Sequence, residues 1–155
     1  MTFRVEGLDP SPFRTLVGRS DDELLAMGVT RCVVDAKPGF PDRIEVRDLE
    51  IGETALLLSY EHQPAATAYR SRHAIFIGET SRRPLNMVDE LPQAILIRPI
   101  SLRAFDDEGV MLAADLADGT ALTPIIERFF GDPRVAYIHA HYAKRGCYAA
   151  CITRA

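Results

Sequence analysis

The stretch "RVAYIHAHYAKRGCYAAC", residues 134–151, is typical of two antiparallel strands joined by a tight turn. Successive side chains of a strand point to opposite faces of a sheet, so His139 and His141 share one face. Ile138 and Ala140 share the opposite face, which is better suited to packing on a core. The hairpin therefore predicts an antiparallel sheet whose polar face carries two of the four histidines of the chain.

The turn Lys144-Arg145-Gly146 decides which face of this hairpin carries Cys147. We expect a three-residue loop, because Gly146 then takes the left-handed position of a bulged type I turn. In that register Cys147 and Cys151 join the histidine face, and Cys151 lies opposite His139. A loop of two or four residues would place both cysteines on the other face, because a shift of one residue reverses every side chain.

Several other segments also have strand patterns. Residues 54–62, "TALLLSYEH", form the most apolar of them, and residues 43–49, "RIEVRDL", alternate apolar and charged side chains. Residues 94–119 predict two more strands joined at Asp106–Gly109. Because strands follow strands without a helix between each pair, we expect an α+β fold with a mainly antiparallel sheet of about eight strands and two short helices.

The first of the two helices is expected at residues 20–28. Ser20 begins it, with a glutamate three residues later that completes a capping box. The second covers about residues 120–130, where apolar side chains recur along one helical face. Thr120 or Thr123 is expected to cap this second helix.

The composition narrows the class of protein. A length of 155 residues suits a single domain, spanning residues 1–155. No apolar run approaches the ~20 residues of a membrane span, and the N-terminus lacks a secretory signal. The net charge of −4 and the lack of a long basic stripe argue against a nucleic-acid partner. Three cysteines, an odd number, predict reduced thiols and a cytoplasmic location.

Tyr60, Glu61 and His62 stand together at the end of the strand expected at residues 54–62. Strand ends often carry functional side chains, because a rigid scaffold aims them. Glu61 and His62 point to opposite faces of a straight strand, but Pro64 favours a bend. These three residues are candidate ligand-binding residues, and the alternative is a solvated strand end.

Tyr69, Arg70 and Arg72 lie in the segment "TAYRSRH", residues 67–73, which we expect to form a loop. The planar guanidinium of arginine suits carboxylate or phosphate groups. These residues are therefore candidates for binding a small anion, and the alternative is a solvated surface. No glycine-rich phosphate loop and no G-x-S-x-G nucleophile motif is present.

These segments lead to three hypotheses. In the first, a small polar or anionic ligand binds between the terminal hairpin and the two polar segments, with His139, His141 and Cys147 as catalytic residues and Arg70 and Arg72 holding the anion. In the second, His139, His141 and Cys147 bind a zinc-type metal ion. In the third, the protein is a structural or interaction module, and exposed strand edges favour a homo-oligomer. The sequence points to no particular cofactor.

Six motifs occur in an order that resembles a bacterial family catalogued as domain of unknown function 1203. They are "FRVEGLDP", "DAKPGFPDR", "LLLSYEH", "YRSRHAIFI", "GDPRVAYIHAH" and "RGCYAA". The resemblance implies a single-domain cytoplasmic bacterial protein and brings no activity. Relatives often have cysteine where this chain has Asp42, and asparagine where it has Tyr142. The resemblance therefore supports no thiol site at Asp42.

Overall fold

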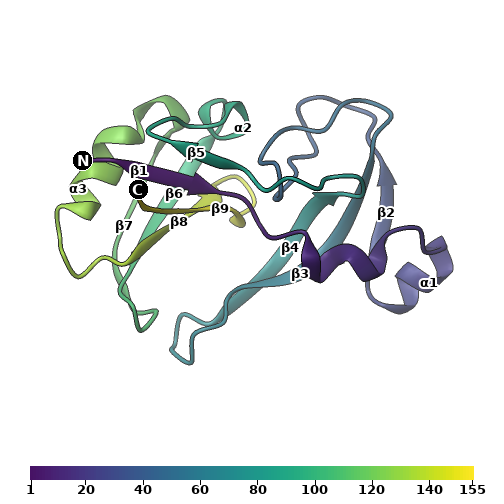
Figure 1. Ribbon diagram of the computed structural model, residues 1–155, viewed down its shortest axis with the longest axis horizontal. Helices are drawn as coiled ribbons and strands as arrows, with labels where there is room; N and C mark the ends of the chain where they lie inside the picture. The colour runs from purple at the N-terminus through teal and green to yellow at the C-terminus, as the bar shows by residue number, and fades with distance from the viewer.

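The computed structural model describes residues 1–155 and holds two antiparallel sheets (Figure 1). The larger sheet has the strand order β5 (Asn86–Val88), β1 (Phe3–Glu6), β9 (Cys147–Arg154), β8 (Tyr137–Tyr142), β6 (Pro99–Phe105), β7 (Met111–Asp118). The smaller sheet has the order β2 (Thr30–Val33), β3 (Thr54–Gln63), β4 (Ser71–Gly78). Every pairing between these strands is antiparallel. The predicted sheet is thus divided into two.

The helices are short. They are α1 (Asp21–Ala26), α2 (Gln93–Leu96) and α3 (Thr123–Phe130), with the 3-10 helices η1 (Ser11–Leu16) and η2 (Gly119–Ala121). The capping box at Ser20 is present, but α3 begins without a side-chain cap, so the predicted threonine cap is wrong. The α+β class is confirmed, with nine strands and three α-helices. No helix is long and apolar enough to cross a membrane.

Each sheet has an apolar core of its own. The main core of 19 buried residues joins one face of the larger sheet to α2 and α3, and it contains Ile138 and Ala140, both fully buried. The predicted core face of the terminal hairpin is therefore confirmed. A second core of nine residues joins Leu24 of α1 to Leu56 and Ile75 of the smaller sheet. The opposite face of β8, which carries the histidines, is left to meet the smaller sheet.

Residues 43–49 do not form the predicted strand. The buried carboxylate of Asp42 accepts hydrogen bonds from the backbone N–H groups of Ile44 and Glu45. A side chain that satisfies nearby backbone donors in this way favours a turn over a sheet ladder. Val46 accordingly has a φ of 51° and turns the chain. The apolar side chains of Ile44 and Val46 are buried as the alternation indicated, but Arg43 is buried as well, and the backbone is not a strand.

The start of the strand predicted over residues 94–105 is helical. Helix α2 occupies Gln93–Leu96, and β6 begins only at Pro99. A proline lacks an N–H group, so the first residue of a strand is one of the few positions in a sheet that it fits. The segment before α2 contains the short edge strand β5.

The predicted three-residue turn of the terminal hairpin is also wrong. Tyr142 lies opposite Cys147, so the loop has four residues, and Gly146 takes the left-handed conformation at its last position, with a φ of 80°. A register shift between Ala140 and His141 then restores the pairing of His139 with Cys151. Cys147 consequently lies on the core face beside Tyr142, opposite to the histidines.

The tips of two hairpins hold the sheets together. Figure 1 shows the β3–β4 hairpin reaching toward the β6–β7 hairpin. Thr67 Oγ1 donates a hydrogen bond of 3.1 Å to the carbonyl of Gly109. Nearby, Gln63 Nε2 donates to the hydroxyl of Tyr137 at 2.8 Å. These contacts bring the end of β3 against the histidine face of β8.

Candidate functional site

Three histidines meet where the two sheets face each other. His62 comes from the end of β3, and His139 and His141 come from the middle and end of β8. One ring nitrogen of each lies within 4.8 Å of the corresponding nitrogens of the other two. The ring centroids of His62 and His141 are 4.9 Å apart, and those of His62 and His139 are 6.0 Å apart. We call these residues the histidine group.

Aromatic and backbone contacts orient the three rings. The ring of His62 stacks on Tyr148 of β9 at 5.5 Å with an angle of 12° between the planes. The ring of His139 meets the same tyrosine edge-on, with the ring centroids 5.2 Å apart. His141 Nδ1 lies 2.9 Å from the carbonyl oxygen of Gly146. Because a carbonyl only accepts, this nitrogen carries the proton, and the Nε2 of His141 is left with its lone pair.

Each ring of the histidine group has a buried nitrogen without a hydrogen-bond partner. These atoms are Nδ1 of His62, Nδ1 of His139 and Nε2 of His141. An unpaired buried polar atom costs about 1–3 kcal/mol of folding stability. Three such atoms in one small cluster therefore indicate a group that can bind a ligand from outside the chain.

Burial keeps these histidines neutral. It lowers the pKa of His62 to about 4 and the pKa values of His139 and His141 to about 3. The guanidinium of Arg103 lowers the pKa of each of them further. Neutral imidazole is the form that binds metal ions, so no proton has to leave at neutral pH.

Arg103 is the arginine whose charge acts on all three histidines. It lies on β6 directly opposite His139. Its guanidinium donates a hydrogen bond of 3.3 Å to the hydroxyl of Ser101 and forms no ion pair with any carboxylate. The histidine group therefore carries no negative charge of its own and faces one unneutralised positive charge.

Cys147 does not join the histidines. Its sulfur lies on the opposite face of the hairpin and accepts a hydrogen bond of 3.0 Å from Nη2 of Arg43. The predicted metal set of His139, His141 and Cys147 is therefore not brought together, because the four-residue turn reverses the face of Cys147. His62 takes the third position instead.

The other predicted ligand residues divide between the two faces of the smaller sheet. Tyr60 packs against Tyr148 with ring centroids 6.2 Å apart, close to the histidine group. Glu61 points away and pairs with Arg70 at 3.0 Å and with Arg72 at 4.0 Å.

The two arginines of this segment are exposed and engaged elsewhere. Besides its pairing with Glu61, Arg72 donates to the hydroxyl of Ser59 at 2.9 Å. Tyr69 packs edge-on against Phe105 with ring centroids 6.3 Å apart. The predicted arginine clamp is therefore not formed beside the histidines. The polar residue that does lie there is Arg103, for which a strand-face position was the only signal in the sequence.

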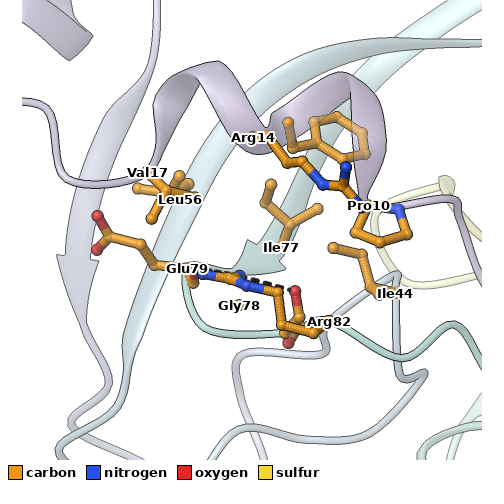
Figure 2. Close-up of a pocket in the computed structure, with 11 residues that line it drawn as sticks. Pro10, Arg14, Val17, Ile44, Leu56, Ile77, Gly78, Glu79 and Arg82 are labelled. Atoms are coloured by element: carbon orange, nitrogen blue, oxygen red, sulfur yellow. Dashed lines mark hydrogen bonds between the residues drawn. The ribbon is translucent and has the colours of Figure 1, made fainter.

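A small hollow beside η1 offers no second site. Figure 2 shows the side chains around it, with Arg82 bonded to the carbonyl oxygens of Glu79 and Ser81 at 2.9 and 3.0 Å. Its volume is about 10 Å³, which is roughly the space of one water molecule. This hollow is too small for an organic ligand.

Comparisons with known proteins give one match. No curated protein and no solved structure matches the chain. A family model described as protein of unknown function (DUF1203) matches residues 39–154, which include all three histidines of the group. The first resembling motif, "FRVEGLDP", precedes the matched range. Since the match covers most of the 155 residues, the chain belongs to the DUF1203 family.

Proposed function

We propose that this protein binds one divalent metal ion of the zinc type through His62, His139 and His141. The observation that supports it most is the meeting of three histidine rings, one nitrogen of each lying within 4.8 Å of the others. Each ring also has a buried nitrogen without a hydrogen-bond partner in the chain. Zinc binds histidine nitrogens at about 2.0–2.1 Å, and three protein ligands leave a fourth position open. Tetrahedral geometry would draw the three nitrogens to roughly 3.4 Å from one another.

The surroundings of the histidines support a metal site. The hydrogen bond from His141 to the carbonyl of Gly146 fixes the ring and its tautomer, as second-shell contacts commonly do for metal ligands. His139 and His141 stand on a central strand, paired on both sides. A rigid strand holds ligand atoms more reproducibly than a loop does.

Histidine-based acid/base chemistry has weaker support than metal binding. A general base works best with a pKa near the working pH, whereas the pKa values of these histidines lie at about 3 to 4. The rings therefore serve as neutral ligands. A bound zinc-type ion would supply Lewis acidity and a water of lowered pKa at the open position.

The fourth ligand is inferred to be a small anion. A divalent ion and Arg103 together bring three positive charges, and the histidine group contains no carboxylate. An oxygen anion at the open position would neutralise part of this charge. The small anionic ligand expected from the sequence thus remains part of the proposal, with Arg103 in place of Arg70 and Arg72.

Three free cysteines suit a reducing compartment such as the bacterial cytoplasm.

The test is a zinc titration of protein prepared without a histidine tag and stripped with a chelator. One equivalent should bind, and cobalt in its place should give the intense visible absorption of a four-coordinate ion. His62→Ala should weaken zinc binding about 100-fold or more, because it removes a direct ligand. His73→Ala is the matched control, since His73 is an exposed histidine on β4 outside the group.

Circular dichroism and the melting temperature of the metal-free variants separate a lost ligand from a lost fold. Zinc binding well below one equivalent would refute the proposal. So would a His62→Ala variant that is folded and binds zinc as tightly as the His73→Ala control.

A further inference from the structure

A larger cavity lies between the smaller sheet and the turn of the terminal hairpin. Its volume is about 490 Å³, within the range of roughly 300–1,000 Å³ that is typical of small-molecule sites. The walls come from the loop at 38–43, from β3 and β4, from residues 98–99 and from the turn after β8. None of the three histidines of the group lines it. The cavity is therefore separate from the proposed metal site.

The lining of this cavity is basic. Its charged and titratable nitrogen groups belong to Arg43, His73, Arg98, Lys144 and Arg145, and no aspartate or glutamate lines it. Arg98 is neutralised by Asp48, with contacts of 2.6 and 2.7 Å. Neither Lys144 nor Arg145 takes part in an ion pair, and both are exposed at the rim. The rim therefore offers two free cations.

Arg43 adds a buried cation to the cavity wall. Its side chain is only 1% exposed. It donates hydrogen bonds to the carbonyl oxygen of Tyr148 at 2.8 Å, to the carbonyl oxygen of Pro41 and to the sulfur of Cys147 at 3.0 Å. All three acceptors lack a carboxylate charge. Arg43 forms no ion pair, although the buried carboxylate of Asp42 lies near enough to act on it electrostatically. A buried charge without a direct partner is costly, so an anion entering the cavity gains attraction from this cation.

Tyr142 supplies an independent sign of a missing polar ligand. Tyr142 lines the cavity, and the guanidinium carbons of Arg43 and Arg98 each lie 5.0 Å from the centroid of its ring. The side chain is 5% exposed, and its hydroxyl has no hydrogen-bond partner. A ligand oxygen inside the cavity would satisfy this hydroxyl.

We propose that this cavity binds a small organic oxyanion, with a phosphate or carboxylate group held between Lys144 and Arg145 at the rim and Arg43 in the wall. The hydroxyl of Tyr142 donates to a ligand oxygen, and the sulfur of Cys147 lies beside the bound group. Phosphate and carboxylate share the chemistry that these cations recognise, so the experiment below uses one probe of each kind.

Alkylation of Cys147 measures the local potential of the cavity. Iodoacetate and iodoacetamide react alike: the thiolate sulfur forms a bond to carbon while the carbon–iodine bond breaks and iodide leaves. The reagents differ in charge, so a basic cavity favours iodoacetate. The ratio of the two rates should be about tenfold higher at Cys147 than at Cys32, which lies on β2 outside the cavity. Peptide mass spectrometry of the full chain assigns each modified cysteine.

A charge-reversal variant completes the test. Lys144→Glu/Arg145→Glu should bring the rate ratio at Cys147 down to that at Cys32. Arg82→Glu/Arg83→Glu makes the same charge change at another exposed basic pair. Neither residue lines this cavity, and Arg82 borders the separate small hollow of Figure 2. This variant should leave the rate ratio at Cys147 unchanged.

Calorimetry decides the matter even if Cys147 reacts with neither reagent. Inorganic phosphate and citrate are titrated into zinc-free His62→Ala protein, so that no bound metal contributes. Saturable binding of either probe, weakened at least tenfold by Lys144→Glu/Arg145→Glu, supports the proposal and identifies the preferred class of anion. The absence of saturable binding, or equal binding to the variant, overturns the proposal without touching the metal site. If Cys147 does react, an iodoacetate-to-iodoacetamide rate ratio that is the same in the native protein and in Lys144→Glu/Arg145→Glu overturns the proposal as well.

Discussion

One hydrogen bond decides the chemistry of His141. Because its Nδ1 donates to the carbonyl of Gly146 at 2.9 Å, only Nε2 is left to accept a metal ion or a proton. Gly146 owes its position to the left-handed conformation at the end of the four-residue turn. The turn that removes Cys147 from the histidine face therefore also fixes the ring of His141.

Arg103 is expected to oppose metal binding when no anion is present. Replacing it with methionine keeps the aliphatic bulk and removes the like charge, so Arg103→Met should bind zinc about fivefold more tightly in a buffer without coordinating anions. A change of this size corresponds to about 1 kcal/mol of Coulomb repulsion across a partly buried site. Competition with a coloured chelator measures it.

Arg72→Met is the control for this substitution, because Arg72 is an exposed arginine bonded to Ser59. Weaker zinc binding in Arg103→Met than in the control would instead make Arg103 a residue that positions the rings, and the repulsion account would fail.

Among the elements, those governed by local sequence could be predicted. Ser20 and its capping box determine where α1 begins, and the histidine spacing on β8 places two imidazoles on one face. Residues 43–49 could not be predicted, because the carboxylate of Asp42 takes the backbone donors of a segment whose pattern alternates like a strand.

The candidate site could be predicted only in part. The sequence placed His62 at a strand end and His139 and His141 on one face. The first hypothesis expected this strand end to lie near the terminal hairpin, but the residue pattern alone could not establish it, because contacts between β3 and β8 join residues far apart along the chain. The face of Cys147 depended on a single residue of turn length, and Gly146 fits equally well as the last residue of a three-residue or a four-residue loop.

The hairpin tips provide a prediction at the scale of elements. A Cβ atom at Gly109 would lie 2.3 Å from the Cβ of Ala65, at the point where the tips of the two hairpins touch. Gly109→Ala should therefore push the β3–β4 hairpin away, displace His62 and weaken zinc binding about tenfold, the lower end of the loss seen when support of a metal ligand is removed.

Gly52→Ala is the matched control for Gly109→Ala. Both glycines have positive φ, 94° and 83° respectively, but a Cβ atom at Gly52 meets nothing within 4 Å. The two variants share the backbone strain of alanine at positive φ. If they bind zinc equally well, the tip contact does not position His62.

At the scale of the whole molecule, the histidine group joins two sheets that have separate cores. A bound ion would link β3 to β8 and stabilise the folded state by about 4 kcal/mol at a free zinc concentration 1,000 times the dissociation constant. The melting temperature should rise with zinc in the native protein and stay constant in His62→Ala. A similar rise in both proteins would mean that zinc acts elsewhere.

The buried histidines also predict that the metal-free protein is destabilised by acid. Their folded-state pKa values, about 4 for His62 and about 3 for His139 and His141, lie below the ordinary value of about 6.5. As the pH falls below about 6.5, these histidines become protonated in the unfolded chain and stay neutral in the folded chain. The free energy of unfolding should then fall by up to about 1.4 kcal/mol per pH unit for each of the buried His139 and His141, until the folded-state pKa is reached. The half-buried His62 should contribute less, because solvent screens its charge.

Chemical denaturation at intervals between pH 7 and pH 4.5 measures this loss. Carboxylates such as Glu53, whose pKa is lowered to about 2 by Arg47, contribute to the acid-induced loss of stability mainly at lower pH. His139→Gln should make the pH dependence shallower, whereas His73→Ala should change it much less, because His73 is only the smallest of the causes that lower the pKa of His62. A flat profile in the native protein would show that the three rings are solvated.

Diffraction at the zinc absorption edge, from crystals of the zinc-loaded protein, tests the central claim most directly. The account predicts one anomalous peak at about 2.0–2.1 Å from a nitrogen of each of His62, His139 and His141. A zinc-loaded crystal with no peak between these rings, or with the ion held by Cys147 or other side chains instead, would contradict it.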